Sequence, residues 1–183
     1  MILETKRLIL RPWTEEDAES LYQYASDPRV GPAAGWEPHT SVENSREIIR
    51  TVLSEPGNLA VEIKDVPGPV GAVGLIRENG HNPHMRRDEL EIGYWLGVPF
   101  WGHGYIPEAV EALLDYAFRQ EGAESVWCGY FDGNEKSRRC QEKCGFRYHH
   151  SVPEIYVEKL GETRTEHFTR LTRAEWEGKN YVN

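Results

Sequence analysis

Two glycines, Gly102 and Gly104, lie one residue apart directly before a stretch with helical periodicity. The first turn of a helix carries backbone N–H groups without intrahelical partners and a partial positive charge. Glycines let a backbone approach a ligand without side-chain collision. This pattern predicts a cradle of backbone amides for an anion such as phosphate or pyrophosphate.

Two well-defined phosphate-binding motifs do not fit this loop. A dinucleotide fingerprint needs a third glycine near position 107, which Pro107 occupies. A nucleoside-triphosphatase loop needs Gly-Lys followed by Ser or Thr, and that sequence is absent. A nucleotide-binding protein that uses the same cradle stays open as a weaker alternative.

The elements that must position this loop follow from hydrophobic periodicity. We expect helices after Thr14 and Ser41, over residues 106–117, and from Asn134 to a stop at Gly145. We expect loops at 31–39, 78–87 and 99–104. The predicted strands are residues 6–11, 58–64, 69–77, 89–96, 124–131, 146–158 and 163–172. Because the chain closes on strands after interspersed helices, this order favours an α+β fold with a mixed sheet.

Length and charge limit the function classes. The chain has 183 residues, which fits a single domain over 1–183. Its formal net charge of −9 disfavours binding to nucleic acid. An acidic surface suits a cationic partner, although acidity also serves solubility alone.

Cysteine and histidine spacing does not indicate a metal. Cys140 and Cys144 are expected to be small buried side chains, and His149 and His150 have no cysteine or acidic cluster beside them. Three cysteines without a targeting segment at Met1 predict reduced thiols and a cytoplasmic location. No apolar run approaches the ~20 residues that span a bilayer, so no membrane partner is expected.

The stretch from Glu91 to Ala109 resembles the central motif of the GNAT acetyltransferases, and specifically their RimJ/RimL-like branch of ribosomal-protein N-terminal acetyltransferases. Three further segments match in the family's order. They are residues 5–12, 134–146 and 171–176. The resemblance therefore covers nearly the whole chain.

This resemblance implies a mixed sheet splayed into a V, with acetyl-coenzyme A in the V as co-substrate and no metal. It implies that the backbone of residues 100–105 holds the pyrophosphate and that residues 94–96 pair with the pantetheine arm. The Leu96 N–H would polarise the thioester carbonyl. The expected cofactor-binding residues are Tyr94, Trp95, Leu96, Trp101, Gly102, His103, Gly104, Tyr105, Asn134 and Ser137.

The implied reaction is transfer of the acetyl group to an amine by direct attack. The amine must lose a proton first, and Glu91 is the expected base, with Glu89 on the same strand face as its substitute. Asn134 is expected to bind the pantetheine arm or a water, or to cap a helix. Ser137, one turn further on, is expected to reach the sulfur or to be an ordinary helix serine.

Two positions depart from the family pattern. Pro99 stands where relatives carry Gln or Arg, and Gln141 stands where many relatives carry a tyrosine acid. The missing tyrosine supports an alternative function, a non-catalytic module that binds acyl-coenzyme A as a sensor or scaffold.

The acceptor is expected to be a peptide or small-molecule amine. Trp36 and Glu37 could receive its cationic group, because an aromatic face and a carboxylate both attract ammonium. Loops 31–40 and 78–87 are expected to decide which amine binds. A monomer and a homodimer remain equally compatible with the sequence.

Overall fold

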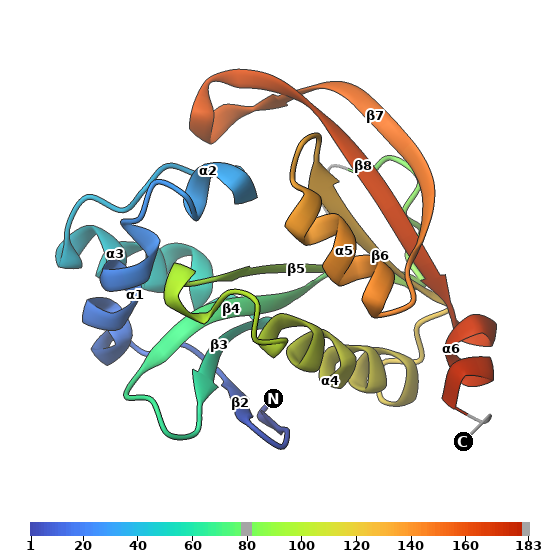
Figure 1. Ribbon diagram of the computed structural model, residues 1–183, viewed down its shortest axis with the longest axis horizontal. Helices are drawn as coiled ribbons and strands as arrows, with labels where there is room; N and C mark the ends of the chain where they lie inside the picture. The colour runs from blue at the N-terminus through green and yellow to red at the C-terminus, as the bar shows by residue number, and fades with distance from the viewer. Residues whose placement is uncertain (78–81, 181–183) are drawn as a thin grey trace.

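The computed structural model describes residues 1–77 and 82–180 (Figure 1). Short 3-10 turns lie at Glu15–Asp17, Val98–Phe100 and Glu158–Leu160, and a π-helical segment lies at Ile49–Leu53. The helices are α1 (Ala18–Ala25), α2 (Gly31–Ala34), α3 (Val42–Ile48), α4 (Tyr105–Arg119), α5 (Glu135–Lys143) and α6 (Arg173–Asn180). The strands are β1 (Leu3–Glu4), β2 (Leu8–Arg11), β3 (Asn58–Ile63), β4 (Pro69–Ile76), β5 (Glu89–Leu96), β6 (Ser125–Phe131), β7 (Arg147–Val157) and β8 (Glu162–Thr172).

The strands form one mixed sheet in the order β1-β2-β3-β4-β5-β6-β8-β7. Within the described residues, β5 and β6 form the parallel pair, and the other neighbours are antiparallel. A parallel connection needs a long crossover, and α4 supplies it between β5 and β6. The predicted α+β fold with a mixed sheet is confirmed.

Two apolar clusters cover the two faces of the sheet. Val61, Val73 and Ile92 pack with the apolar stripe of α4, whose Leu113 and Leu114 are fully buried. On the opposite face Ala60 and Ala72 pack with residues of α1 and with Ile49. Side chains alternate along a strand, so neighbouring residues of β3 and β4 serve different clusters.

Two predicted segments differ from the structure. Residues 31–39 were expected to form a loop, but 31–34 form α2, which Pro32 starts and Gly35 ends at a φ of 93°. The chain was expected to close on strands, but α6 follows β8. At the start of α6, the Glu175 carboxylate accepts a hydrogen bond from the Thr172 N–H across 2.9 Å. Four-residue helices and short polar helices carry too little periodicity to be predicted.

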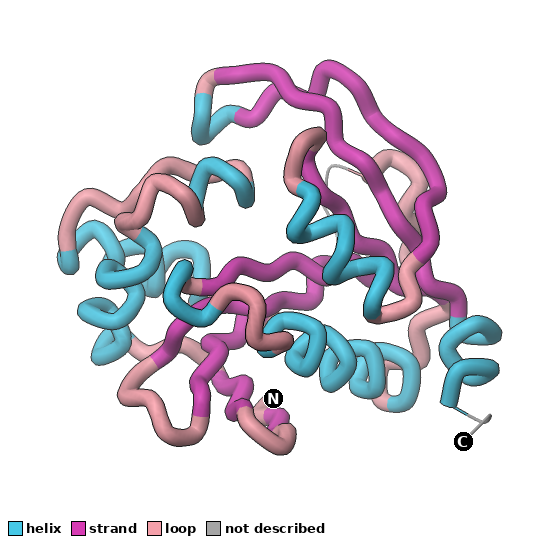
Figure 2. The backbone as a smooth tube through the Cα atoms, in the orientation of Figure 1, coloured by secondary structure: helices cyan, strands magenta, loops and turns pink. Residues whose placement is uncertain are grey.

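The hairpin of β7 and β8 arches over the molecule toward α2 (Figures 1 and 2). A hydrogen bond between the two segments agrees with this view, because the Arg164 guanidinium of β8 donates to the Pro32 carbonyl of α2. The Asn134 amide donates to the neighbouring Ala33 carbonyl across 3.3 Å. The hairpin and α5 therefore hold α2 over the place where β5 and β6 separate.

Candidate active site

The two central parallel strands separate halfway along their length. Pairing runs from Glu89 with Ser125 to Ile92 with Cys128 and then stops. From Gly93 to Leu96, β5 keeps only β4 as a neighbour. The Gly97 N–H donates to Val70 of β4, and because strand N–H groups alternate in direction, the Leu96 N–H points to the open side.

A cleft of about 1590 Å³ occupies this opening. Its volume exceeds the roughly 300–1,000 Å³ of pockets for drug-sized ligands, so it has room for a large ligand and a second molecule. The walls come from α2, β5, the loop before α4, β6, α5 and β8. Figure 2 shows these elements around the gap between β5 and α5.

The glycine loop and the start of α4 form one wall of the cleft. Gly102 and Gly104 have φ values of 79° and 77°, in the left-handed region that favours glycine. A Cβ at Gly102 would meet nothing within 4 Å, so the backbone there faces open space. Gly104 caps α4 without a side-chain hydrogen bond, which leaves the first-turn N–H groups available to an anion.

Arg7, which directly precedes β2, holds this loop in place. Its Nε donates to Glu108 of α4 across 2.6 Å, and its Nη1 donates to the His103 carbonyl across 2.9 Å. Its guanidinium also lies 4.4 Å from the centre of the Tyr105 ring. These contacts explain why an N-terminal basic residue accompanies the glycine loop.

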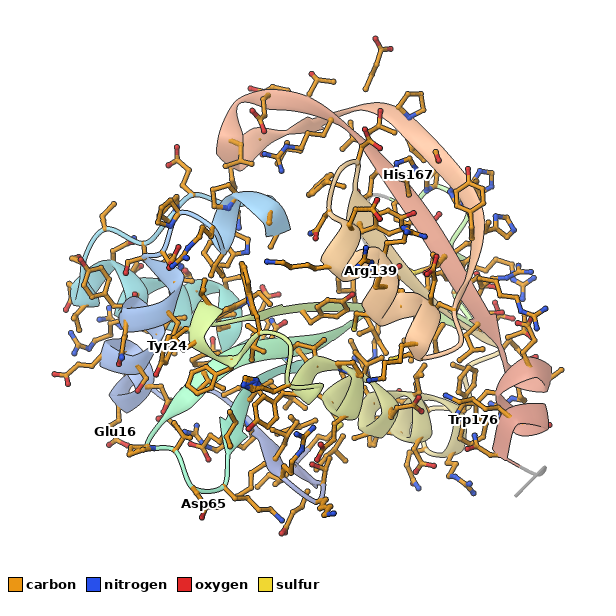
Figure 3. The ribbon with its side chains drawn as sticks, viewed as in Figure 1. Glu16, Tyr24, Asp65, Arg139, His167 and Trp176 are labelled. Atoms are coloured by element: carbon orange, nitrogen blue, oxygen red, sulfur yellow. The ribbon has the colours of Figure 1, made fainter. Side chains whose placement is uncertain are left out.

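Basic side chains from α5 line the cleft opposite the glycine loop. Lys136, Arg139 and Lys143 recur at helical spacing, and the Lys136 ammonium lies 3.5 Å from the centre of the Trp101 ring. Figure 3 shows Arg139 on α5 at this level. These three basic residues were not predicted as cleft residues from the sequence, although their spacing of three and four residues was a readable signal. In a chain of net charge −9, these cations favour an anionic ligand.

The structure places nine predicted cofactor residues in the cleft wall and leaves His103 outside it. His103 is exposed and stacks beside Tyr105, with 6.0 Å between the ring centres. The nine are Tyr94, Trp95, Leu96, Trp101, Gly102, Gly104, Tyr105, Asn134 and Ser137.

Both polar groups of the Asn134 side chain are used by the protein. Its Oδ1 accepts from the Ser137 N–H at 3.2 Å and so caps α5, and its Nδ2 donates to Ala33. Ser137 lines the cleft, and its hydroxyl lies 2.8 Å from the Tyr94 hydroxyl. The helix-cap role expected for Asn134 is confirmed.

Two carboxylates, Glu91 and Glu166, line the cleft where the strands part, and each side chain belongs to a residue only 7% exposed. Glu166 comes from β8 and lies against Gly129, where a Cβ would stand 2.4 Å from its Oε1. No sequence pattern indicated Glu166, since only the pairing of β8 with β6 places it there. Glu89, the substitute base, lies outside this cleft and accepts from the Trp127 indole at 2.8 Å.

The residues expected to receive the acceptor lie behind the cleft wall. Trp36 packs edge-on against Trp95, with 5.7 Å between ring centres, and Glu37 is exposed outside the cleft. His149 and His150 stack around Trp127, outside the cleft. Part of the predicted acceptor loop, residues 78–81, lies outside the described residues.

Residues 1–77 and 82–180, which the structure describes, contain neither a cluster of metal ligands nor a membrane-spanning helix. This part of the chain has no group of three or more His, Cys, Asp or Glu side chains placed to hold a metal ion. None of its helices is long and apolar enough to cross a membrane.

Residues 7–147 match the acetyltransferase (GNAT) domain family. The N-acetyltransferase YoaA of Bacillus subtilis, itself uncharacterized, is 30% identical over 151 residues, covering 80% of this chain and 82% of YoaA. The uncharacterized N-acetyltransferase p20 of Bacillus licheniformis is 37% identical over 124 residues, covering 63% of this chain and 65% of p20. The match thus spans just under two thirds of p20.

Solved structures share the fold at lower identity. A GNAT-family acetyltransferase from Bacillus anthracis superposes with a TM-score of 0.81 at 23% identity, covering 96% of this chain and all of the other. The ribosomal-protein-S5-alanine acetyltransferase from Vibrio fischeri superposes with a TM-score of 0.72 at 20% identity, covering 96% and 98%. With the parted strands, the glycine loop and the family match in agreement, the chain is an enzyme of the GNAT acetyltransferase family.

Proposed function

We propose that this enzyme transfers the acetyl group of acetyl-coenzyme A to a primary amine. The observation that carries the proposal is the cleft between β5 and β6, which joins a strand edge without a neighbouring strand to a helix N-terminus without a side-chain cap. On this edge the Leu96 carbonyl accepts from the Trp101 indole at 2.7 Å. A long ligand with an anionic end and an extended amide-containing arm suits both features.

The residues present fit coenzyme A. The open space at Gly102 and the uncapped N–H groups of Tyr105 and Ile106 would hold its pyrophosphate. Lys136 and Arg139 would add charge to its phosphates. The edge of β5 at Tyr94 to Leu96 would pair with the pantetheine arm, as an added strand does.

Bound acetyl-coenzyme A supplies an acetyl group activated as a thioester. In our proposal Glu91 accepts the proton that the ammonium must lose, directly or through a water. The Leu96 N–H stabilises negative charge on the carbonyl oxygen, because it points into the opening. Ser137 faces the same cleft from α5 and contacts the departing sulfur.

The acceptor class is proposed as a protein N-terminus or a small-molecule amine. YdaF of Bacillus subtilis, whose name provisionally assigns it to the ribosomal N-acetyltransferases, is 33% identical over 100 residues, and this supports the RimJ/RimL-like branch. Glu91 and Glu166 suit a cationic amine of either kind. A cytoplasmic location and a monomer or homodimer complete the proposal.

The test combines binding with turnover. Calorimetry should detect coenzyme A binding, and a thiol reagent should detect coenzyme A release when acetyl-coenzyme A is mixed with peptides carrying free N-termini and with small amines. Mass spectrometry should find one acetyl group on the acceptor. Binding without thiol release from any amine would support the alternative of a non-catalytic acyl-coenzyme A module, and stronger binding of ATP than of coenzyme A would support a nucleotide-binding protein.

A further inference from the structure

Gln141 stands on α5 where many relatives carry a tyrosine, and its side chain is almost fully buried, with 1% of the residue exposed. Its Nε2 donates to the Gly129 carbonyl at 2.9 Å and to the Ser137 Oγ at 3.1 Å. Its Oε1 accepts from the Thr169 hydroxyl at 2.7 Å. The amide orientation is therefore fixed, because a reversed amide would place two acceptor oxygens together at Gly129.

The Ser137 hydroxyl has a second neighbour on its other side. The Tyr94 Oη lies 2.8 Å from the Ser137 Oγ and 3.2 Å from the Ser137 carbonyl, so its proton is placed to reach both acceptors. Burial raises the pKa of the Tyr94 phenol, which keeps it protonated as a donor near neutral pH.

A serine hydroxyl has one proton and two acceptor positions. When Tyr94 is the donor of the hydrogen bond that the two hydroxyls share, Gln141 and Tyr94 fill both acceptor positions and the Ser137 proton is left to point elsewhere. Ser137 lines the cleft between the parted strands, so this proton can point into the cleft. Two donors acting on one oxygen also polarise its O–H group and strengthen the bond that it donates.

We infer that Gln141 is a positioning residue that, with Tyr94, turns the Ser137 proton into the cleft toward the departing coenzyme A thiolate. This inference rests on the proposed function. It explains how the leaving group is stabilised without the tyrosine acid. The sulfur leaves as an anion held by a charge-assisted hydrogen bond, and no proton transfer from the protein is needed, since a free thiol has a pKa of about 8.5.

The variants follow from donor and acceptor roles. Gln141→Glu keeps the shape of the side chain, but an ionised carboxylate only accepts, so the Ser137 proton turns toward it and away from the cleft. Gln141→Met removes the amide without adding a charge. Tyr94→Phe removes the second donor. Glu142→Gln changes the neighbouring residue of α5, which faces solvent in an ion pair with Arg138, and is the matched control.

The measurement compares coenzyme A with desulfo-coenzyme A, which lacks only the sulfur, by calorimetry between pH 6.5 and 9.5. If the site prefers the thiolate, the bound thiol ionises at lower pH than the free thiol. In the unchanged protein, the affinity for coenzyme A relative to desulfo-coenzyme A should then rise by about tenfold with pH, the size of one charge-assisted hydrogen bond. Glu142→Gln should keep this rise.

Most of this pH-dependent rise in coenzyme A affinity should be lost in Ser137→Ala, Gln141→Glu and Gln141→Met, and part of it in Tyr94→Phe. All four variants should bind desulfo-coenzyme A with an affinity within twofold of that of the unchanged protein. Binding of desulfo-coenzyme A also shows which variants are folded. If the Gln141 variants do not fold, Tyr94→Phe and Ser137→Ala still test the hydrogen-bond arrangement.

Three results would count against the inference. A full rise in both folded Gln141 variants would remove Gln141 from this role. Tyr94→Phe with a full rise would remove the paired-donor arrangement. No rise in the unchanged protein, with both ligands bound, would show that the Ser137 proton does not face the sulfur. Failure of the unchanged protein to bind either ligand would instead overturn the proposed function itself.

Discussion

At the scale of single residues, the site depends on polar atoms that are already committed to the protein. The Asn134 amide caps α5 and holds Ala33, so it supports the cleft wall rather than presenting a free group. Glu91 lines the cleft from β5, close to the end of strand pairing. In the proposed reaction, Glu91 is the side chain that accepts the proton of the amine.

Glu91→Gln should lower kcat by about 100-fold, since a positioned general base contributes roughly 10²–10⁴-fold. The affinity for coenzyme A should stay within about twofold, because the amide keeps the size of the side chain. Steady-state thiol release and calorimetry measure the two quantities. Glu89→Gln is the comparison, and a rate loss in that variant alone would move the base from Glu91 to Glu89.

At the scale of elements, α4 joins the catalytic cleft to the hydrophobic core. Its N-terminus faces the cleft at Gly104, and its buried stripe packs on β2, β4, β5 and β6. The stripe fixes the helix axis, so the amide cradle cannot move independently of the sheet. The geometry of the anion site is therefore set by packing more than ten residues away along the chain.

Gly104→Glu should reduce the affinity for coenzyme A by more than about 100-fold, because one buried like-charge contact costs several kcal/mol. Gly122→Glu is the matched control, since Gly122 has a similar φ of 70° and lies in open surroundings beyond the far end of α4, whereas a Cβ at Gly104 would lie 3.6 Å from the Arg7 Nη2. Both variants should lose about 1–2 kcal/mol of unfolding free energy from left-handed strain. Equal coenzyme A affinities in the two variants would exclude this loop as the phosphate site.

The C-terminal helix α6 covers the opposite end of α4. Trp176, labelled in Figure 3, stacks on Phe118 with 5.0 Å between ring centres. The Arg119 guanidinium lies 5.1 Å from the centre of the Trp176 ring. Trp176→Ala should lower the unfolding free energy by about 3–5 kcal/mol, the usual loss for a buried tryptophan. Chemical denaturation measures this loss. Glu177→Ala, on the same helix, should change stability by less than about 0.5 kcal/mol, and a small effect of Trp176→Ala would show that α6 is peripheral.

At the scale of the whole molecule, charge is distributed unevenly. The chain carries a net charge of −9, yet five basic side chains from α5, β8 and the segment before α2 line the cleft, beside four acidic ones. A cleft with local positive charge focuses the field and attracts anionic ligands even when the rest of the surface is acidic. The basic cleft residues are Arg29, Lys136, Arg139, Lys143 and Arg164.

The stability of the whole fold should depend on pH through His39. Its pKa falls from 6.5 to about 4, because the ring is buried and the Lys159 ammonium of the hairpin lies nearby. In the unfolded chain His39 takes up a proton below about pH 6.5, whereas in the folded protein it takes up this proton only near pH 4. Stability should therefore be fully present above pH 6.5 and fall by up to about 3 kcal/mol toward pH 4.

Denaturant titrations at pH 7.5 and pH 4.5 measure this loss. The Ser45 hydroxyl lies 2.8 Å from the His39 Nδ1. His39→Gln should reduce the difference in unfolding free energy between the two pH values, because Gln can keep this hydrogen bond without titrating. An undiminished pH dependence in this variant would assign the effect to other groups.

Local pattern determined much of this protein. The apolar spacing from Ile106 to Ala117 predicted α4, and the left-handed glycine that ends α5 at Gly145 was readable in the sequence. The cofactor residues predicted from the glycine loop and the neighbouring motifs also lie in the cleft wall, apart from His103. These features depend on interactions within one turn or one strand, and such interactions leave a periodic signal in the sequence.

Tertiary structure alone decided which segments meet. The sequence did not indicate that β8, rather than β7, lies beside β6. This pairing brings Glu166 to the cleft and places the Thr169 hydroxyl against Gln141. The contact of Arg164 with α2 joins residues more than a hundred positions apart. A pattern in one element specifies which of its faces is buried, but not which partner covers that face, because the partner is selected by packing and pairing of the whole sheet.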